Sequence, residues 1–291
     1  MKINKKTVYA LWSGAILLCV VLSVFSLLFA SCAKPSDSGG SQAGKTDGSG
    51  FVSQEEPGQS ADEPTAPPQT EAPQTPAPSQ TSGTRLTETA DAGREYLEKI
   101  VFLGDSTTYG IAYYYDRGYT QLAPSRNVWT PASGTLTLAY HSTATIVYPE
   151  TGEELSIVDA VTRAKPEYMM ITLGVNGISF MDEEWFIRDY TALVQNIQAA
   201  CPETKIILNS MYPVAASYAS LDEINNEKIT AGNGWIEQVA ENTGCRYLNS
   251  YEALVGADGF LPESSHNGDG LHLSGETFEI VMEYIRTHAY Q

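Results

Sequence analysis

Short apolar runs alternate with amphipathic segments over residues 90–291, and this alternation restricts the possible folds more than any other feature of the chain. Four segments contain runs typical of buried strands, IVFL (100–103), YMMITLGVNG (168–177), KIILNS (205–210) and CRYLNS (245–250). Strands that alternate with helices indicate a parallel, doubly wound sheet. We therefore predict an α/β domain, a three-layer α/β/α sandwich around a mostly parallel sheet.

The segments between these strands carry helical signals. Helices are predicted within 92–100, at 107–115, at about 182–200, at about 221–242 with a break or loosening near AGNG (231–234), and within 273–289. Ser274 is a suitable N-cap for the last of them. The stretch 127–160 is less regular, and within it TIVYPETGEELSIV is expected to form a hairpin that turns at residues 150–152, with a helix from about Ile157.

The N-terminus has the pattern of a secretory signal. Lys2, Lys5 and Lys6 precede an apolar run over residues 8–30, and small residues follow it. The ending FASC resembles a bacterial lipobox, which implies lipidation of Cys32. The run is also long enough to remain as an uncleaved membrane anchor over residues 1–31. Either alternative predicts a protein held at the cell membrane with its C-terminal domain on the extracytoplasmic face, because the lysines stay in the cytoplasm.

Residues 32–88 are rich in Ser, Gly, Pro, Thr and Gln and contain hardly any large apolar side chain. Such a segment buries too little surface to offset the entropy of ordering, so we predict a disordered tether. The folded domain is then expected over residues 89–291.

Composition restricts the partners. The formal net charge of −18 lacks the basic footprint of a nucleic-acid-binding protein, so no nucleic-acid partner is expected. The domain is expected to be monomeric. No cluster of His, Cys and carboxylate residues has ligand spacing and no dinucleotide fingerprint is present, so we predict no metal and no cofactor. Cys201 and Cys245 each precede a strand, and the sequence leaves open whether they pair.

Polar and reactive residues follow several of the predicted strands. Ligands of an open parallel sheet bind beyond the carboxyl ends of its strands. Gly104-Asp105-Ser106 follows the first strand, Asn176 lies at the end of the second segment, Tyr212 follows the third, and Asp269 and His272 precede the last helix. The sheet would bring these segments to one edge.

Each of these signals is weak by itself. Gly-Asp-Ser is also the pattern of a strand-to-helix turn in which Asp or Ser caps the helix, and we assign Asp105 a structural role there. His141, His266 and His288 have no evident partner in the sequence and receive no role.

In combination, however, FLGDSTTYG, LGVNG and DGLHLS resemble, in this order, three sequence blocks of the SGNH (GDSL-type) hydrolases. The resemblance spans about residues 98–291 and implies a flavodoxin-like fold. It further implies that Ser106 is a nucleophile, that Asp269 and His272 complete a triad, and that the oxyanion donors are the Ser106 N–H, the Asn176 amide and a glycine N–H best matched by Gly134.

These roles agree with the chemistry of the residues. A serine hydroxyl needs a base within hydrogen-bond reach, and Asp269 at i−3 can share a loop with His272 and fix its tautomer. Tyr212 and Phe180 closely follow strand ends and are predicted to contact substrate. We expect an esterase that removes a small acyl group, such as acetyl, from a carbohydrate or cell-envelope substrate. Alternatives are a lipase, lysophospholipase or thioesterase of the same fold, or a non-catalytic glycan-binding lipoprotein.

Overall fold

The computed structural model describes residues 83–291. The predictions for the signal segment, for Cys32 and for most of the tether therefore lie outside the described residues. No helix within the described part of the chain is both long and apolar enough to span a membrane.

A five-stranded sheet lies at the centre of the domain, and all of its neighbouring strands are parallel. Its order is β2 (Val128–Trp129), β1 (Ile100–Gly104), β5 (Tyr168–Thr172), β6 (Lys205–Asn209) and β7 (Arg246–Leu248). The predicted hairpin is present as a separate antiparallel pair, β3 (Thr145–Val147) and β4 (Glu154–Ser156). The predicted parallel sheet is thus confirmed.

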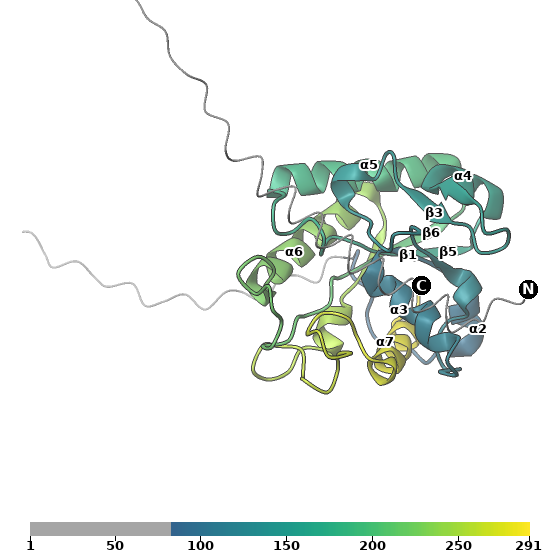
Figure 1. The fold of residues 1–291 in the computed structure, drawn as a ribbon. Coiled ribbons are helices and arrows are strands. Elements are labelled where there is room, and N and C mark those ends of the chain that lie inside the picture. Colours follow the sequence, from purple (N-terminus) through teal and green to yellow (C-terminus); the bar gives the residue numbers. More distant parts are fainter. Residues whose placement is uncertain (1–82) are drawn as a thin grey trace, which may run out of the picture. The chain divides into compact units, whose positions relative to one another are not determined.

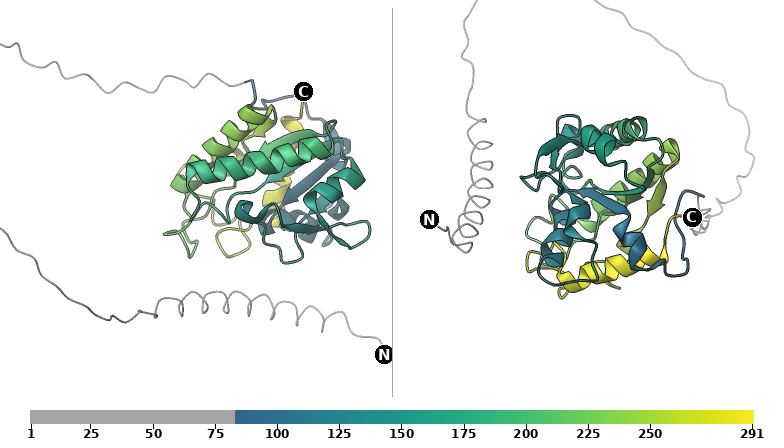
Figure 2. Two further views of the ribbon diagram at one scale, coloured as in Figure 1. Left: turned by 90° about the horizontal axis from the view of Figure 1, so that it is seen from above. Right: turned by 90° about the vertical axis from the view of Figure 1, so that its right-hand side faces the viewer.

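Helices cover both faces of the sheet (Figures 1 and 2). One face is covered by α2 (Gly93–Glu98), α3 (Ser106–Tyr115) and α7 (Gly275–Thr287), and the other by α4 (Ile157–Ala164), α5 (Glu183–Ala200) and α6 (Asn226–Thr243). Short 3₁₀ helices lie at Ser125–Asn127, Leu138–Tyr140 and Ser250–Ala253. The three-layer α/β/α sandwich is the architecture that the alternation predicted.

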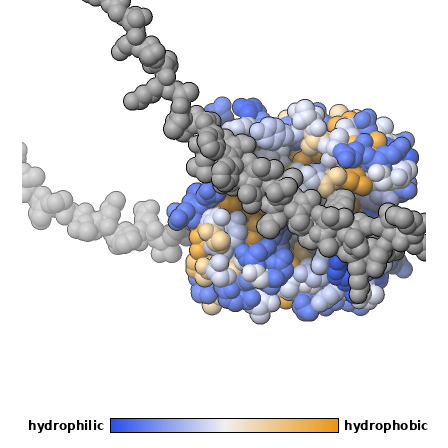
Figure 3. Space-filling model, viewed as in Figure 1, coloured by the Kyte–Doolittle hydropathy of each residue, from blue (hydrophilic) through white to orange (hydrophobic). Residues whose placement is uncertain are grey.

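Successive strand residues point into two separate cores, as the period of two in a strand requires. In β1, the buried side chain of Phe102 belongs to the core with Ile111 and Phe278, and that of Leu103 to the core with Phe186 and Val194. Because both faces are buried, the central strands are nearly continuous apolar runs. On the outer surface seen in Figure 3, hydrophilic residues surround smaller apolar areas.

The structure differs from the sequence-based prediction at two elements. Strand β2 was not predicted, because two residues at a sheet edge give no periodic pattern. Helix α6 begins at Asn226 and runs without a break through 231–234, where a break or loosening was predicted. A Cβ on Gly232 would lie 2.6 Å from side-chain atoms of Ile178 and Met211, so the glycine permits close packing instead of ending the helix.

The domain also begins earlier than residue 89. Residues 84–86 pair with β7: the Leu86 N–H donates to the Tyr247 carbonyl, the Tyr247 N–H donates to the Thr84 carbonyl, and the Leu86 side chain is buried. These residues were assigned to the tether from composition. Cys201 and Cys245 are both free and buried, which answers the question of pairing that the sequence left open.

Candidate active site

Four segments meet at the carboxyl ends of the parallel strands. Ser106 is the first residue of α3, directly after β1 and Asp105. Asp105 is the N-cap of this helix, and its Oδ1 accepts hydrogen bonds from the Thr107 N–H (2.9 Å) and the Thr107 hydroxyl (2.7 Å). The cap is therefore the aspartate, which leaves the Ser106 hydroxyl free for other contacts.

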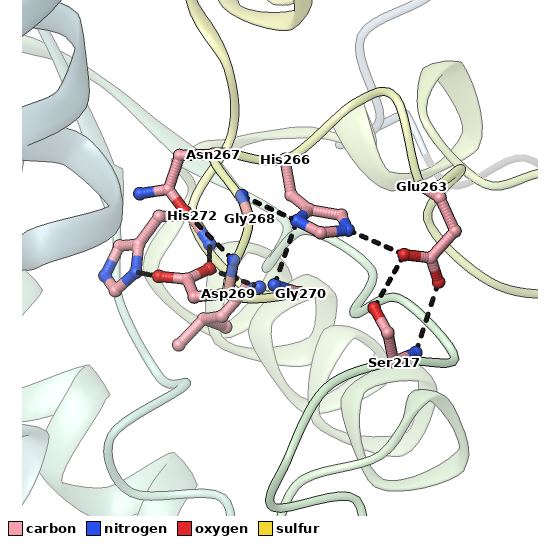
Figure 4. A network of polar contacts seen from close by, with 9 residues as sticks. Ser217, Glu263, His266, Asn267, Gly268, Asp269, Gly270 and His272 are labelled. Carbon is pink, nitrogen blue, oxygen red and sulfur yellow. Dashed lines mark hydrogen bonds and ion pairs between the residues drawn. The ribbon is translucent and has the colours of Figure 1, made fainter.

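The Ser106 hydroxyl lies against His272. The distance from Ser106 Oγ to His272 Nε2 is 2.9 Å, and His272 Nδ1 lies 2.6 Å from Asp269 Oδ2 (Figure 4 shows the second contact). The His272 side chain is 31 % exposed, so a substrate can reach it from solvent. The structure thus brings Ser106 together with Asp269 and His272, which follow it by more than 160 residues in the sequence.

The backbone around Asp269 favours its ionised form. Oδ1 of Asp269 accepts the N–H groups of Leu271 and His272, both at 2.8 Å. Partial burial raises the pKa of Asp269, but these two N–H donors and the His272 ring outweigh burial and lower it overall. An ionised carboxylate keeps a proton on Nδ1 of His272, and Nε2 is then an acceptor for the serine hydroxyl.

The Ser106 N–H and the Asn176 amide, which were predicted as oxyanion donors, both adjoin Asp105. As the first residue of α3, Ser106 has an N–H without an intrahelical acceptor, at the positive end of the helix dipole. The Asn176 amide nitrogen donates to Asp105 Oδ2 at 2.9 Å and to the Leu136 carbonyl at the longer distance of 3.3 Å. An NH₂ group has two hydrogens, so both of them have acceptors within the protein in this conformation.

The N–H of Gly134, the third predicted oxyanion donor, is used within its own turn in this conformation. Its N–H donates to the Pro131 carbonyl at 2.9 Å and closes a turn in which Gly134 has a φ of 74°. This segment instead contacts the site through the Leu136 carbonyl, which accepts a hydrogen bond from the Asn176 amide. The glycine was matched by sequence alone, and the N–H from this segment stays unassigned.

Asp105 is an unusual member of the site because it is completely buried. Burial raises its pKa to about 6, and the hydrogen bonds from Thr107 oppose this rise only in part. Asp105 therefore braces the helix turn, as predicted, and in addition holds the Asn176 amide, which the sequence did not indicate.

The two residues predicted to contact substrate lie differently. Tyr212 is buried beneath the site, where its pKa is raised by burial and where it lines a cavity of about 10 Å³ with Asp105 and Leu271. This residue is only 7 % exposed in this conformation. Phe180 is 52 % exposed and packs edge-on against Trp185, and no described contact joins it to Ser106 or His272.

His266 and Glu263 are the residues that the sequence analysis missed. His266 was left without a partner, but its Nε2 lies 3.0 Å from Glu263 Oε2, and its Nδ1 accepts the N–H groups of Gly268 and Gly270, both at 3.0 Å. A signal was present: Glu-x-x-His at 263–266 repeats the spacing of Asp-x-x-His at 269–272. Among residues 83–291, no three His, Cys, Asp or Glu side chains gather as a metal site.

Comparison with known proteins agrees with this geometry. The model of the GDSL-like lipase/acylhydrolase family matches residues 102–280, and no curated protein matches the chain. A Streptococcus pneumonia structure provisionally described as a platelet activating factor aligns with a TM-score of 0.50 at 17% identity, over 67% of this chain and 90% of the other. A GDSL-like lipase from Bacteroides thetaiotaomicron aligns with a TM-score of 0.48 at 20% identity, over 67% of this chain and 89% of the other.

The matched region covers more than half of the chain, so the class is established: this chain belongs to the GDSL-like lipase/acylhydrolase family. It is a hydrolase that acts on ester bonds.

Proposed function

We propose that this hydrolase is a serine esterase in which Ser106, His272 and Asp269 form the catalytic triad. The observation that supports it most strongly is the continuous chain of contacts from Ser106 Oγ through the His272 ring to Asp269. If Ser106 only capped helix α3, there would be no reason for a histidine nitrogen at 2.9 Å from its hydroxyl or for a carboxylate at the other nitrogen of that ring.

The reaction follows from the positions of these groups. His272 Nε2 takes the Ser106 hydroxyl proton as Oγ attacks the ester carbonyl carbon, and the imidazolium is stabilised by Asp269. Negative charge collects on the former carbonyl oxygen, where the Ser106 N–H and the Asn176 amide donate to it. His272 then returns the proton to the leaving alcohol as the ester C–O bond breaks. Water, activated by the same nitrogen, adds to the acyl-enzyme, and the acid leaves with regeneration of the Ser106 hydroxyl.

A small cavity lies next to the chain neighbours of Ser106 and His272. The cavity that borders Asp105, Thr107 and Leu271 measures about 10 Å³, which suffices for about one water molecule. The long acyl chain of a lipid needs a far larger apolar cavity. This cavity therefore offers no room for a long chain, which supports a small acyl group such as acetyl that stays at the partly exposed side of His272.

Exposed tyrosines support a carbohydrate as the alcohol part of the ester. Tyr109 and Tyr113 follow Ser106 by three and seven residues, so they share its face of α3, and they are 50 % and 39 % exposed. Aromatic faces beside a nucleophile suit the C–H faces of sugar rings.

We also propose that the protein is held at the cell membrane with its domain on the extracytoplasmic face. The basic and apolar N-terminus and Cys32 support this location.

The test compares wild-type protein with the Ser106→Ala variant on p-nitrophenyl esters of increasing chain length and on acetylated sugars. We expect activity to be highest on acetyl esters, and kcat of the variant to fall by about 10⁶-fold. A fluorophosphonate probe should label the wild type and leave the variant unlabelled. Wild-type turnover by Ser106→Ala would refute the triad, and a preference for long chains would identify a lipase or thioesterase instead. A wild-type protein without turnover or labelling would be a binding module.

The location is tested at Cys32. In bacterial cells that express the full chain, a clickable palmitate analogue should label the wild type and leave Cys32→Ala unlabelled, because the thiol is the acceptor of the lipid. Externally added protease should cleave the tether and release the domain. A wild type without palmitate label that stays in the membrane fraction would show that residues 1–31 remain as an anchor.

A further inference from the structure

The segment between Glu263 and Ser274, here called the triad loop, carries Asp269 and His272 and also contains His266. The His266 side chain is only 6 % exposed, so its ring lies inside the loop. It belongs to a network that extends from Ser217 through Glu263 to the backbone beside Asp269, as Figure 4 shows.

His266 binds the backbone on both sides of Asp269. Its Nδ1 accepts the N–H of Gly268, which precedes Asp269, and the N–H of Gly270, which follows it, both at 3.0 Å. A ring nitrogen can accept only when it carries no proton. The proton of neutral His266 therefore lies on Nε2.

Glu263 faces that proton. Its Oε2 lies 3.0 Å from His266 Nε2 and accepts the Ser217 hydroxyl at 2.6 Å, and its Oε1 accepts the Ser217 N–H at 3.2 Å. The Ser217 and His266 contacts lower the pKa of Glu263, so the carboxylate stays ionised and holds the Nε2–H tautomer.

Gly270 is fixed at both of its backbone groups. Its N–H donates to His266, and its carbonyl accepts the Ala215 N–H at 2.8 Å, which ties the loop to the segment after β6. Gly270 has a φ of 82°, and a Cβ here would lie 2.7 Å from the Tyr218 backbone. The loop conformation that presents Asp269 thus depends on contacts to its backbone.

We propose that His266 is a positioning residue that holds the Asp269 carboxylate against His272, by accepting the two backbone N–H groups that flank Asp269. Glu263 maintains the tautomer that this requires. The inference rests on the proposed function, because positioning matters for turnover only if Asp269 and His272 act as a triad. A displacement of about 1 Å in such a group can lower the rate by about 10²-fold.

Three substitutions of His266 distinguish the effect of the Nδ1 acceptor from the effect of the rest of the side chain. His266→Phe keeps the ring and removes both nitrogens. His266→Gln places an amide at the position of Nε2 without an acceptor at Nδ1, and His266→Asn places an oxygen at the position of Nδ1. We expect kcat on p-nitrophenyl acetate to fall by about 10–100-fold for Phe and Gln with little change in KM, and by less than about threefold for Asn.

His288→Phe is the matched control, since His288 stacks on Tyr284 at the end of α7, away from the loop, and its loss should leave kcat unchanged. Wild-type kcat for His266→Phe, or equal losses for Asn and Phe, would overturn the proposal. Should the Phe variant not fold, ¹⁵N NMR of the wild type decides: an unprotonated Nδ1 on His266 supports the proposal and a protonated one overturns it. Activity of Ser106→Ala would instead refute the triad itself, which keeps the two failures distinct.

Discussion

Two acid–histidine pairs of identical spacing lie in tandem in the triad loop, and each holds its imidazole ring by a different nitrogen. Asp269 contacts Nδ1 of His272 at 2.6 Å, whereas Glu263, with a side chain one methylene longer, contacts Nε2 of His266 at 3.0 Å. In each pair, the carboxylate keeps the proton on the nitrogen that it faces, and the opposite nitrogen becomes an acceptor.

The acceptor nitrogens face different groups, and this difference determines what each pair can do. Nε2 of His272 faces the Ser106 hydroxyl, and the ring is partly open to solvent. Nδ1 of His266 faces two backbone N–H groups inside the loop, and the ring is almost fully covered. A carboxylate paired with a histidine can therefore activate the Ser106 hydroxyl through His272, and it can fix the backbone of Gly268 and Gly270 through His266.

Breaking the first pair should have the larger effect. In Asp269→Asn, the side-chain oxygen can still accept the backbone N–H groups, but the amide NH₂ would face Nδ1 of His272. That arrangement favours the tautomer with its proton on Nε2, which cannot take the proton of Ser106. We expect kcat to fall by about 10⁴-fold with KM nearly constant, measured on p-nitrophenyl acetate. A loss of less than tenfold would show that Asp269 is not the partner of the catalytic histidine.

Breaking the second pair should have a smaller effect. In Glu263→Gln, one amide cannot accept from both His266 Nε2–H and the Ser217 N–H, so the network loses one of these bonds or the His266 tautomer changes. We expect kcat to fall by about tenfold or less, since the displacement of Asp269 is indirect. Glu276→Gln is the control, because Glu276 also accepts a hydroxyl, that of Tyr119, but on α7. Equal kcat values for the two variants would remove Glu263 from the positioning network.

The comparison of the two pairs also shows where sequence-based prediction succeeds. The central strands were found because both of their faces are buried and their residues are continuously apolar. Ser106, Asn176, Asp269 and His272, which the structure places at the same edge of the sheet, were selected because each occurs in a short block whose order fits such an edge. These signals are local in the sequence.

The features that were missed depend on contacts that a local pattern does not show. The local spacing Glu-x-x-His shows one partner of His266, but its other two partners are backbone amides, which every residue except proline supplies. Gly232 was interpreted as a helix breaker because its close neighbours, Ile178 and Met211, come from distant segments. Gly134 was selected by its residue type, although its N–H is used within its own turn.

A third carboxylate sharpens the comparison through the pH dependence of stability. Asp105 has a pKa raised to about 6 by burial, whereas the pKa of Asp269 is lowered. Between about pH 4 and 6, the folded protein keeps the Asp105 proton that the unfolded chain has lost, so Asp105 makes the free energy of unfolding decrease as the pH rises. Asp269 acts in the opposite sense, because its contribution to stability is lost as the pH falls below its unfolded pKa.

The Asp105→Asn substitution should therefore change how the free energy of unfolding depends on pH, and not only its value at one pH. We expect the free energy of unfolding of this variant to improve relative to wild type as the pH rises from 4 to 7, by up to about 3 kcal/mol. Urea unfolding at pH 4, 5, 6 and 7 measures this difference, and Asp269→Asn should show the reverse trend over the acidic part of the range. Parallel pH profiles for wild type and Asp105→Asn would mean that Asp105 is ionised in the folded protein throughout. The buried carboxylate would then owe its charge to Thr107 and Asn176, whose hydrogen bonds would outweigh its burial.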